Sequence, residues 1–251
     1  MPRSILITGA SSGLGEALAR HYAQPRRTLF LSGRDEGRLE ATAHWARNAG
    51  AEVYTRVMDV TDRDGMAEWI GDCDAIRSLE LVIANAGISA GTGLHGESEA
   101  QTRAIFAVNL DGVMNTVLPA VAAMRPRRVG QVALMSSLAS FRGMPGAPAY
   151  CASKAAVRVW GEGLRGELAR DNIRVSVICP GFVTTRMTAV NDFPMPFLMD
   201  ARRAAAIMAK GLAKDRGRIS YPWPMAALTW LSAALPDAAM DWIARRLPAK
   251  G

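Results

Sequence analysis

The sequence predicts a single α/β domain built on a doubly wound parallel sheet with helices on both faces. Short apolar runs alternate with longer amphipathic stretches along most of the 251 residues, a pattern typical of strands and helices in turn. A glycine-rich turn directly follows the first apolar run, where a first strand would lead into a first helix. No internal repeat, low-complexity segment or Pro/Gly-rich linker interrupts the pattern, so residues 1–251 are expected to form one domain.

The composition limits the classes of function. A hydrophobic content of 49% allows a large buried core. The net charge of +7 comes from 30 Lys and Arg against 23 Asp and Glu, scattered without a run of five, which favours solvated faces and an anionic cofactor over nucleic acid. The three cysteines are far apart without CxxC spacing, which indicates a reducing compartment and no structural metal. The chain starts without a basic leader and apolar segment, so we expect a cytoplasmic protein.

Strands and helices are expected to alternate in a fixed order. The runs expected as strands are Ile5–Thr8, Thr28–Ser32, Val53–Val57, Leu81–Ala84, Val132–Met135 and Arg174–Ile178. The stretches expected as helices are about Leu14–Gln24, Asp35–Ala49, Asp62–Ile76, Glu99–Met124 and Tyr150–Ala169, with a kink or local break at Pro119. In such a sheet the ligand crevice lies beyond the carboxyl ends of the strands, so motifs at the strand ends should meet there.

The first expected strand ends in TGASSGLG, residues 8–15. Glycines at positions 9, 13 and 15 let the backbone turn sharply and bring the unpaired N–H groups of a helix start close to a pyrophosphate. The spacing differs from the usual G-x-G-x-x-G fingerprint, and a plain Gly/Ser loop is the alternative. Its position directly after a first strand favours a phosphate cradle.

The second expected strand ends in Ser32, Gly33 and Arg34. In dinucleotide folds an acidic residue near this place holds the ribose 2′-hydroxyl, whereas an Arg accommodates a 2′-phosphate. Here Gly33 stands where the acid would be, and the planar fork of Arg34 suits a phosphate. The alternative is a surface Arg followed by Asp35 as a helix N-cap. We therefore expect NADP(H), with NAD(H) as the other choice.

Tyr150 and Lys154 stand four residues apart, so a helix through them places both on one face. An adjacent ammonium favours the phenolate and moves the pKa of a tyrosine toward a range useful for acid/base catalysis. Ser137 ends an apolar run thirteen residues earlier, where its hydroxyl could bind a substrate oxygen beside the phenol. A half-buried Tyr beside a solvated Lys is the ordinary reading of such a pair taken alone.

Separated motifs follow one another along the chain in a recognisable order. They are Thr8-Gly9-x3-Gly13-x-Gly15, Asp59-Val60, Asn85-Ala86-Gly87, Asn109, Ser137, Tyr150-x3-Lys154 and Pro180-Gly181. In this order the chain resembles the short-chain dehydrogenase/reductase family, in its branch of about 250 residues, over roughly Ser4 to Met187. The resemblance implies a Rossmann sheet, a nicotinamide cofactor, and reversible hydride transfer between the nicotinamide and a carbonyl or secondary alcohol.

The resemblance also implies catalytic roles. Tyr150 would donate the proton to the carbonyl oxygen during reduction, Ser137 would hydrogen-bond that oxygen, and Lys154 would lower the phenol pKa and hold the nicotinamide ribose. Ser136 competes with Ser137; the family spacing favours Ser137, and strand alternation lets only one of the two face the crevice. Asn109 resembles the residue that holds a water linking Lys154 to solvent, with a bond to a nearby backbone carbonyl as the alternative.

Cofactor contacts are implied in the same way. Asp59 and Val60 would border the adenine, with an Asp-opened turn as the structural alternative. Asn85 would stabilise the sheet or face the adenosine ribose. The loop after Pro180 would bind the carboxamide through the Val183 N–H and the Thr185 hydroxyl, or form a plain Pro-Gly turn. The full expected set is Gly9, Ser11, Ser12, Gly13, Leu14, Gly15, Arg34, Asp59, Val60, Asn85, Ala86, Gly87, Tyr150, Lys154, Pro180, Gly181, Val183 and Thr185.

The resemblance weakens after Met187, and residues 188–251 are expected to hold a variable substrate lid and C-terminal helices. The stretch 188–199, TAVNDFPMPFLM, is too apolar to be left wholly in water. Met and Phe side chains adapt to irregular apolar ligands, so a lid that includes Phe193 and Phe197 predicts a hydrophobic carbonyl or alcohol substrate. A loop that merely covers the core is the alternative.

Two further helices are expected at Met225–Leu235 and Ala238–Leu247. Neither apolar run approaches the roughly 20 residues that a bilayer requires. A face with Trp223, Trp230 and Trp242 would more often pack on the protein's own body or a partner subunit than lie on a membrane surface. We also expect a homo-oligomer, a dimer or a tetramer.

Two classes of function fit this sequence. An NADP(H)-dependent oxidoreductase would use Ser137, Tyr150, Lys154 and Asn109. A cofactor-binding sensor or interaction protein on the same fold would need none of that proton chemistry. The intact set of four side chains therefore favours the enzyme.

Overall fold

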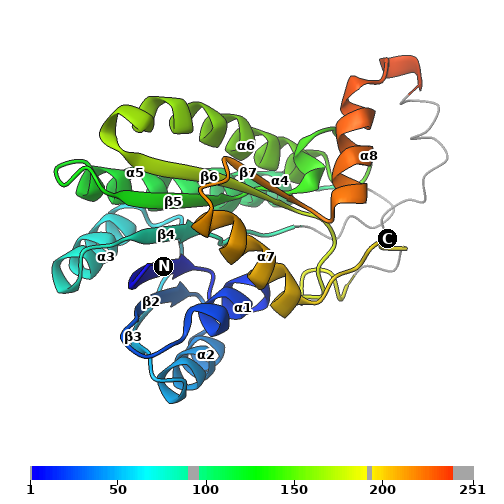
Figure 1. The fold of residues 1–251 in the computed structure, drawn as a ribbon. Coiled ribbons are helices and arrows are strands. Elements are labelled where there is room, and N and C mark those ends of the chain that lie inside the picture. Colours follow the sequence, from blue (N-terminus) through cyan, green and yellow to red (C-terminus); the bar gives the residue numbers. More distant parts are fainter. Residues whose placement is uncertain (1, 90–95, 191–193, 240–251) are drawn as a thin grey trace.

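The computed structural model describes residues 2–89, 96–190 and 194–239 of the chain. Within these residues the strands are β1 (Ser4–Thr8), β2 (Thr28–Gly33), β3 (Glu52–Val57), β4 (Leu81–Ala84), β5 (Gly130–Met135), β6 (Ile173–Pro180) and β7 (Arg218–Tyr221). They form one parallel sheet in the order β3-β2-β1-β4-β5-β6-β7 (Figure 1). The order reverses between β1 and β4, the place where sheets of this kind open a ligand crevice.

The predicted doubly wound parallel sheet is confirmed. Six strands agree with the predicted runs to within two residues at each end. The seventh, β7, is absent from the predicted set because its residues do not form an apolar run, with exposed Arg218 next to buried Ile219. It extends the sheet by pairing in parallel with β6.

Helices fill the connections between the strands. They are α1 (Gly13–Tyr22), α2 (Glu36–Asn48), α3 (Arg63–Ile76), α4 (Glu99–Phe106), α5 (Gly112–Met124), α6 (Pro148–Leu168), α7 (Ala201–Ala213) and α8 (Trp223–Ala234), with a π-helical turn η1 (Ala107–Asp111) and 3-10 turns η2 (Leu138–Ser140) and η3 (Ala169–Asp171). The predicted helices between residues 14 and 169 are confirmed. Helix α7 is missing from the prediction, although its buried Ala204, Ala205, Met208 and Leu212 recur at helical spacing.

The helical path from Glu99 to Met124 does not break at Pro119, so the predicted local break is wrong, and a kink there stays a prediction. Helix α5 continues through Pro119, and the departure from α geometry is η1, earlier in the chain. The carbonyl that Pro119 leaves without an N–H partner is that of Asn115, a half-buried residue one turn earlier in α5. By length and composition this stretch could cross a membrane, but half of it is buried inside the fold, as in the core helix of a globular protein.

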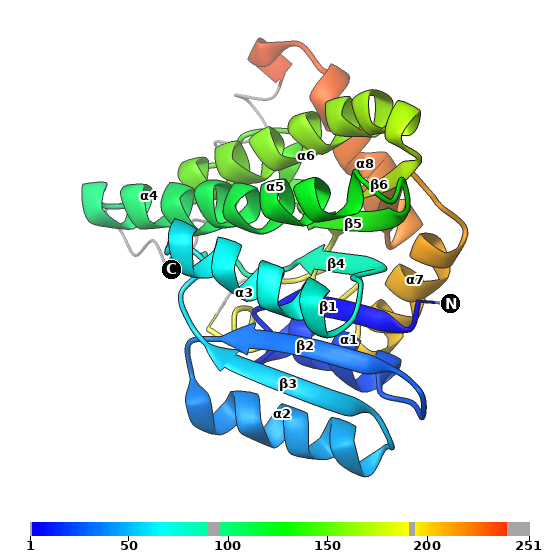
Figure 2. The ribbon, with the colours of Figure 1, turned by 90° about the vertical axis from the view of Figure 1, so that its left-hand side faces the viewer.

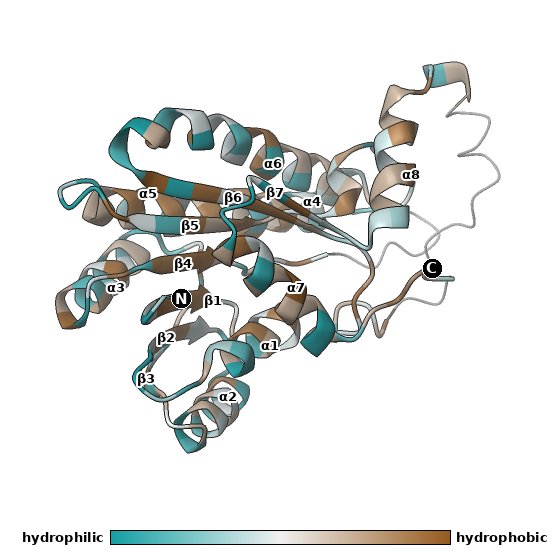
Figure 3. Cartoon of the chain, in the orientation of Figure 1, coloured by the Kyte–Doolittle hydropathy of each residue, from teal (hydrophilic) through white to brown (hydrophobic). Residues whose placement is uncertain are grey.

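The core lies in two layers, one on each face of the sheet. Helices α1, α2 and α7 cover one face, and α3, α5 and α6 cover the other (Figures 1 and 2). Along β1 the side chains alternate between these layers: Ile5 and Ile7 pack toward α1 and α7, and Leu6 packs toward α3 and α5. Figure 3 shows the corresponding pattern, with apolar strands inside and hydrophilic helix surfaces outside.

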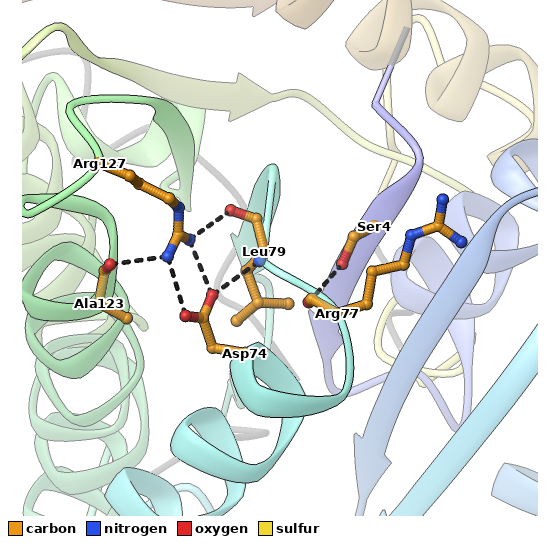
Figure 4. Close-up of polar contacts among 6 residues, drawn as sticks. All are labelled: Ser4, Asp74, Arg77, Leu79, Ala123 and Arg127. Atoms are coloured by element: carbon orange, nitrogen blue, oxygen red, sulfur yellow. Dashed lines mark hydrogen bonds and ion pairs between the residues drawn. The ribbon is translucent and has the colours of Figure 1, made fainter.

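A polar network closes the sheet at the amino ends of its central strands, opposite the expected crevice. Arg127 makes two hydrogen bonds of 2.8 Å to the Asp74 carboxylate, and it donates to the Ala123 and Leu79 carbonyls at 2.7 and 2.9 Å (Figure 4). Asp74 in turn accepts from the Leu79 N–H at 2.7 Å. The network joins α3, α5 and the start of β4, so it anchors the end of the fold opposite the carboxyl ends of the strands.

Helix α8 stands apart from the helices that cover the sheet (Figure 1). Trp223 and Trp230 on its outer side are 78% and 62% exposed, so the expected packing of this face on the protein's own body is wrong for these two residues. A partner subunit and a membrane surface remain predictions for it. Trp242 and most of the predicted helix Ala238–Leu247 lie outside the described residues.

Candidate active site

A cavity of about 820 Å³ opens at the carboxyl ends of the strands, where the sequence predicts the crevice. The loops after β1, β2, β3, β4, β5 and β6 line it, together with the start of α6 and one side of α8. Of the expected catalytic residues, Ser137, Tyr150 and Lys154 line the cavity. The expected cofactor residues all line it except Gly15.

The glycine turn after β1 is packed too closely for side chains. A Cβ atom on Gly9 would lie 2.8 Å from the Ala86 Cα, and one on Gly15 would lie 2.2 Å from the Gly9 carbonyl oxygen. Gly9 also has a φ of +66°, which glycine adopts without strain. Gly15 itself does not line the cavity. Its lack of a side chain lets α1 start close to the turn, and the turn presents its backbone to the cavity. This is the cradle that an anionic phosphate group requires.

Side chains from β1 and β4 fix this turn. The Asn85 amide donates to the Thr8 and Gly9 carbonyls at 2.9 and 3.3 Å. The Thr8 hydroxyl accepts from the Asn85 and Ala86 N–H groups at 3.0 and 3.1 Å. Of the two roles considered for Asn85, the structure shows the one that ties the strands together.

Two arginines and two acids gather at the end of β2. Arg34 lies 3.5 Å from the Asp59 carboxylate, and Arg38 lies 2.8 Å from the carboxylate of Asp35, the N-cap of α2. All four residues line the cavity. Arg38 is a site residue that the sequence reasoning missed, although it stands only four residues after Arg34. Both ion pairs are largely exposed, so either guanidinium can exchange its partner at little cost.

Asp59 takes the structural alternative and also borders the cavity. Its carboxylate accepts from the Thr61 N–H and hydroxyl at 3.0 and 2.9 Å, which is an Asp-opened turn. Burial opposes ionisation of this carboxyl, but these hydrogen bonds and the Arg34 guanidinium outweigh it and lower the pKa of Asp59. Asp59 is therefore a fixed negative charge beside Arg34.

Tyr150 and Ser137 meet in the cavity wall. The Ser137 hydroxyl lies beside the Tyr150 phenol and accepts from the Ala139 N–H at 3.1 Å. Burial raises the pKa of Tyr150, and the neighbouring Ser137 hydroxyl offsets part of that rise. The phenol is therefore held protonated, as a proton donor to an oxygen atom must be.

Lys154 is buried behind the phenol, with 3% of its surface exposed. Its ammonium donates to the Met135 carbonyl at 2.9 Å and lies 5.8 Å from the centre of the Tyr150 ring. Burial lowers the pKa of Lys154 itself to about 8. Burial is the largest influence on the pKa of Tyr150, and an effect of the Lys154 ammonium on that pKa stays a prediction.

The two adjacent serines have different partners. The Ser136 hydroxyl donates to the Lys154 backbone carbonyl at 2.7 Å and is buried, whereas Ser137 lies beside the phenol. Both serines border the cavity, so the expectation that only one of them would face it is wrong. Strand alternation does not apply here, because β5 ends at Met135. The choice of Ser137 over Ser136 as the partner of Tyr150 agrees with this geometry.

Asn109 is fully buried in η1 and does not line the cavity. Its carboxamide accepts from the Ile88 N–H at 2.8 Å and donates to the Ile88 carbonyl at 2.9 Å. It also donates to the Ser153 hydroxyl at 3.1 Å. The structure thus shows the alternative role, a side chain bound to backbone, which clamps the loop after β4 against α6. A Cβ on Gly87 would lie 3.1 Å from both the Asn109 Oδ1 and the Lys154 Nζ, so Gly87 keeps these two groups close.

Helix α6 brings Tyr150 and Lys154 to one face, as predicted, and begins with Pro148 at its first position. Ala147 has no side chain to cap the helix, and the Glu97 carboxylate instead accepts from the Ala149 N–H at 2.7 Å. A carboxylate at a helix start is stabilising because it faces unpaired N–H groups. Glu97 is a second residue that the sequence reasoning missed, and no local pattern could reveal a contact across 52 positions.

The loop after β6 bends back over the glycine turn. Gly181 donates to the Tyr221 carbonyl at 2.7 Å, and the buried Val183 pairs with Met199. A Cβ on Gly13 would lie 3.2 Å from a methyl carbon of Thr185, so the glycine lets this loop approach α1. The loop and the turn therefore face each other across one part of the cavity.

The predicted lid is only partly supported. Pro194 and Pro196 line the cavity, but the Phe197 side chain does not and is 52% exposed. Met199 is buried as core, which agrees with the alternative of a core cover at this end. Phe193 lies outside the described residues. The apolar character of the cavity comes instead from Leu138, Met144, Pro145, Phe182, Met187 and Met225.

With this geometry established, comparison with known proteins decides the family. A family model described as short chain dehydrogenase matches residues 3–193. This chain belongs to the short-chain dehydrogenase family. An oxidoreductase from Myxococcus xanthus (strain DK1622), itself described as uncharacterized, is 39% identical over 98% of this chain and 97% of its own. A 3-oxoacyl-(acyl-carrier-protein) reductase from Thermotoga maritima is 34% identical over 73% of this chain and 75% of its own.

Solved structures of short-chain dehydrogenases share the fold. A short chain dehydrogenase/reductase from Burkholderia phymatum in complex with NAD matches with a TM-score of 0.83 and 24% identity, over 99% of this chain and 97% of that one. Levodione reductase matches with a TM-score of 0.80, also at 24% identity, over 90% and 98%. Members of this oxidoreductase family bind nicotinamide cofactors, act on small molecules and commonly form oligomers. The closely packed glycine turn fits the phosphates of such a cofactor.

Proposed function

We propose that this short-chain dehydrogenase transfers a hydride reversibly between NADP(H) and the carbonyl or secondary alcohol of an apolar small molecule, with Tyr150 as the general acid/base. The observation that supports it is that Ser137 and Tyr150 lie beside each other in the wall of the cavity that also contains the glycine turn. The nicotinamide supplies the hydride when it is bound. The residues of this chain bind the oxygen atom and move its proton.

In the reductive direction, Ser137 orients the substrate oxygen and Tyr150 gives it a proton. The protonated state of the phenol, favoured by burial, is the state needed at the start of this step. As the phenolate forms, the buried Lys154 ammonium 5.8 Å from the ring centre stabilises its negative charge more than it stabilises the neutral phenol. Ser136 holds the backbone of Lys154 in place through its carbonyl.

Tyr150→Phe tests the chemistry. The change removes one hydroxyl and keeps the ring, so turnover of any reducible carbonyl should fall by about 10²–10⁴ while NADPH binding stays within about twofold. Tyr54→Phe is the matched control, since its hydroxyl bonds Glu52 at 2.9 Å on β3, outside the cavity. Near-normal turnover by Tyr150→Phe would exclude the phenol as the acid. No turnover by the unaltered protein on a broad carbonyl panel would favour a cofactor-binding sensor.

The preference for NADP(H) is supported by the guanidinium groups of Arg34 and Arg38, which line the cavity beside Gly33. Replacing both arginines by Ala should weaken NADPH binding by about 1.5–3 kcal/mol for each charged hydrogen bond lost, and NADH binding much less. Equal losses for the two nucleotides, measured by fluorescence titration, would contradict the preference. The substitution Gly33→Asp, which would favour NADH, adds a side chain as well as a charge. Space for that side chain is limited, because a Cβ at Gly33 would lie 3.0 Å from the Ser11 hydroxyl oxygen.

A further inference from the structure

Arg142 is a cation in the cavity for which the hydride-transfer chemistry has no use. It follows η2, the short turn that begins at the serine beside the phenol, and it lines the same cavity as Tyr150. We propose that Arg142 binds an anionic group of the substrate, so that the enzyme acts on apolar carbonyl or alcohol compounds that carry a carboxylate or a phosphate ester. This inference rests on the proposed oxidoreductase function and adds a second recognition point to it.

The present partners of Arg142 leave it available. Its guanidinium donates to the Asp237 carboxylate at 2.6 Å and to the Leu235 carbonyl at 3.4 Å, just beyond the end of α8. The Arg142 side chain is only 25% exposed, whereas the Asp237 side chain is 93% exposed. A pair whose carboxylate lies in water contributes roughly 0–1 kcal/mol. A cation withdrawn from water without an equally buried counter-charge is unfavourable, and a ligand anion in the cavity would relieve that cost.

The charges around the cavity favour a negative ligand at this place. Among the described residues that line it, the acids are Asp35 and Asp59, both at the end of β2 or β3 and both already paired with Arg38 and Arg34. The neighbours of Arg142 along the loop that also line the cavity are apolar, Leu138, Met144 and Pro145. An apolar chain that ends in an anion would therefore match both the apolar wall and the guanidinium, with the exposed Asp237 carboxylate as its competitor for Arg142.

The loop that carries Arg142 is anchored by the residue before it. The guanidinium groups of Arg158 and Arg218 lie 4.8 and 5.5 Å from the centre of the Phe141 ring. Phe141 also packs against the cluster of Leu138, Val177 and Cys179. The loop thus has a fixed position that does not depend on Arg142. The competing role for Arg142 is a latch on the end of α8, whose Met225, Thr229 and Ser232 line the cavity.

Ligands of different charge and two substitutions distinguish anion binding by Arg142 from a structural role in which Arg142 only holds the end of α8. The probes are a medium-chain keto acid, its methyl ester, and the keto-alkyl phosphate of equal chain length. Their dissociation constants are measured by calorimetry on the NADPH-loaded Tyr150→Phe protein, so that binding does not depend on turnover. The substitutions are Arg142→Ala and Asp237→Asn, and the matched control is Arg125→Ala, an arginine that pairs with Asp171 at the opposite end of the sheet.

For an anion site, Arg142→Ala should weaken binding of the acid or the phosphate about tenfold or more, the factor for one charged hydrogen bond, and change binding of the ester less than about twofold. Asp237→Asn should act in the opposite direction, because it removes a competing carboxylate and frees the guanidinium for the ligand. The anion whose affinity falls more, the carboxylate or the phosphate, is the group that the site recognises. Arg125→Ala should leave all three probes unaffected.

A latch predicts something different: both substitutions release α8, so both weaken the acid and the ester by similar factors. That result would overturn the inference, and so would equal affinity of the unaltered site for the acid and the ester. In either case, turnover of a ketone can still support the proposed function. Conversely, acid-specific loss in Arg142→Ala without turnover of any ketone by the unaltered enzyme keeps the anion site and refutes the proposed function.

Discussion

Lys154 offers the sharpest test of the electrostatics of this site, because its ammonium is buried and faces a backbone carbonyl rather than an acid. Replacing it by Met keeps a long apolar side chain and removes the charge. The cofactor-free variant should be more stable than the unaltered protein at pH 7, even though it should lose turnover. A functional group that destabilises its own fold is expected where a site needs a charge in a dry place.

The magnitude follows from the pKa of Lys154, which burial lowers from 10.5 to about 8. Each tenfold change in proton affinity is worth about 1.4 kcal/mol, so the buried charge costs about 3 kcal/mol at pH 7. Losing the hydrogen bond to the Met135 carbonyl offsets about 1 kcal/mol, which leaves a net gain of about 2 kcal/mol for Lys154→Met. Between pH 8 and 10.5 the unfolded chain binds more protons at Lys154 than the folded chain does. The stability of the unaltered protein relative to the variant therefore rises with pH in that window.

Urea unfolding of both proteins at pH 7 and pH 9.5 measures this directly. The difference between them should shrink by about 2 kcal/mol at the higher pH, because Lys154 is then largely neutral in the folded state. Other titrating groups are common to both proteins and cancel in the comparison. Lys210→Met, on the exposed side of α7, is the control and should show the same small effect at both pH values. A stability difference for Lys154→Met that does not change with pH would refute the reasoning.

The remaining predictions concern the glycine turn, the polar network and the loop before α7. Gly15→Ala should weaken NADPH binding at least about tenfold in a titration and destabilise the fold by about 1–3 kcal/mol, because its Cβ would lie 2.2 Å from the Gly9 carbonyl oxygen; unchanged affinity would exclude the cradle. Arg127→Ala should cost about 2–3 kcal/mol in urea unfolding, less than a fully buried pair with Asp74 would, and leave turnover unaltered; a Tm within a degree of the unaltered protein would contradict it. Phe197→Gly should raise the Tm slightly, because Phe197 has a φ of +58°, which glycine adopts with less strain. It should leave substrate specificity unchanged, because the ring is exposed; a change in specificity would show that Phe197 belongs to a substrate lid.

The residues that sequence reasoning missed share one property. Glu97 caps α6 from the other side of the cavity wall, and Arg142 meets Asp237 across 95 positions. Asn109, expected near the proton path, is held by Ile88 on a loop from another strand. Each contact joins two segments that are far apart in the sequence, and no periodic pattern or motif spacing relates them. Arg38 is the exception, because it stands only four residues after Arg34 and could have been recognised from the sequence.

The sequence by itself determined the order of strands and helices from β1 to β6, the glycine turn after β1, and the placement of Tyr150 and Lys154 on one face of α6. These features depend on the local period of apolar residues and on backbone freedom at single positions, which neighbouring residues decide. Only the tertiary structure decided that Ser137 rather than Ser136 meets the phenol, and that Lys154 donates to Met135. It also decided the direction in which the pKa of each buried group moves. Desolvation and long-range hydrogen bonds come from the packing of distant elements, and no local pattern of residues records them.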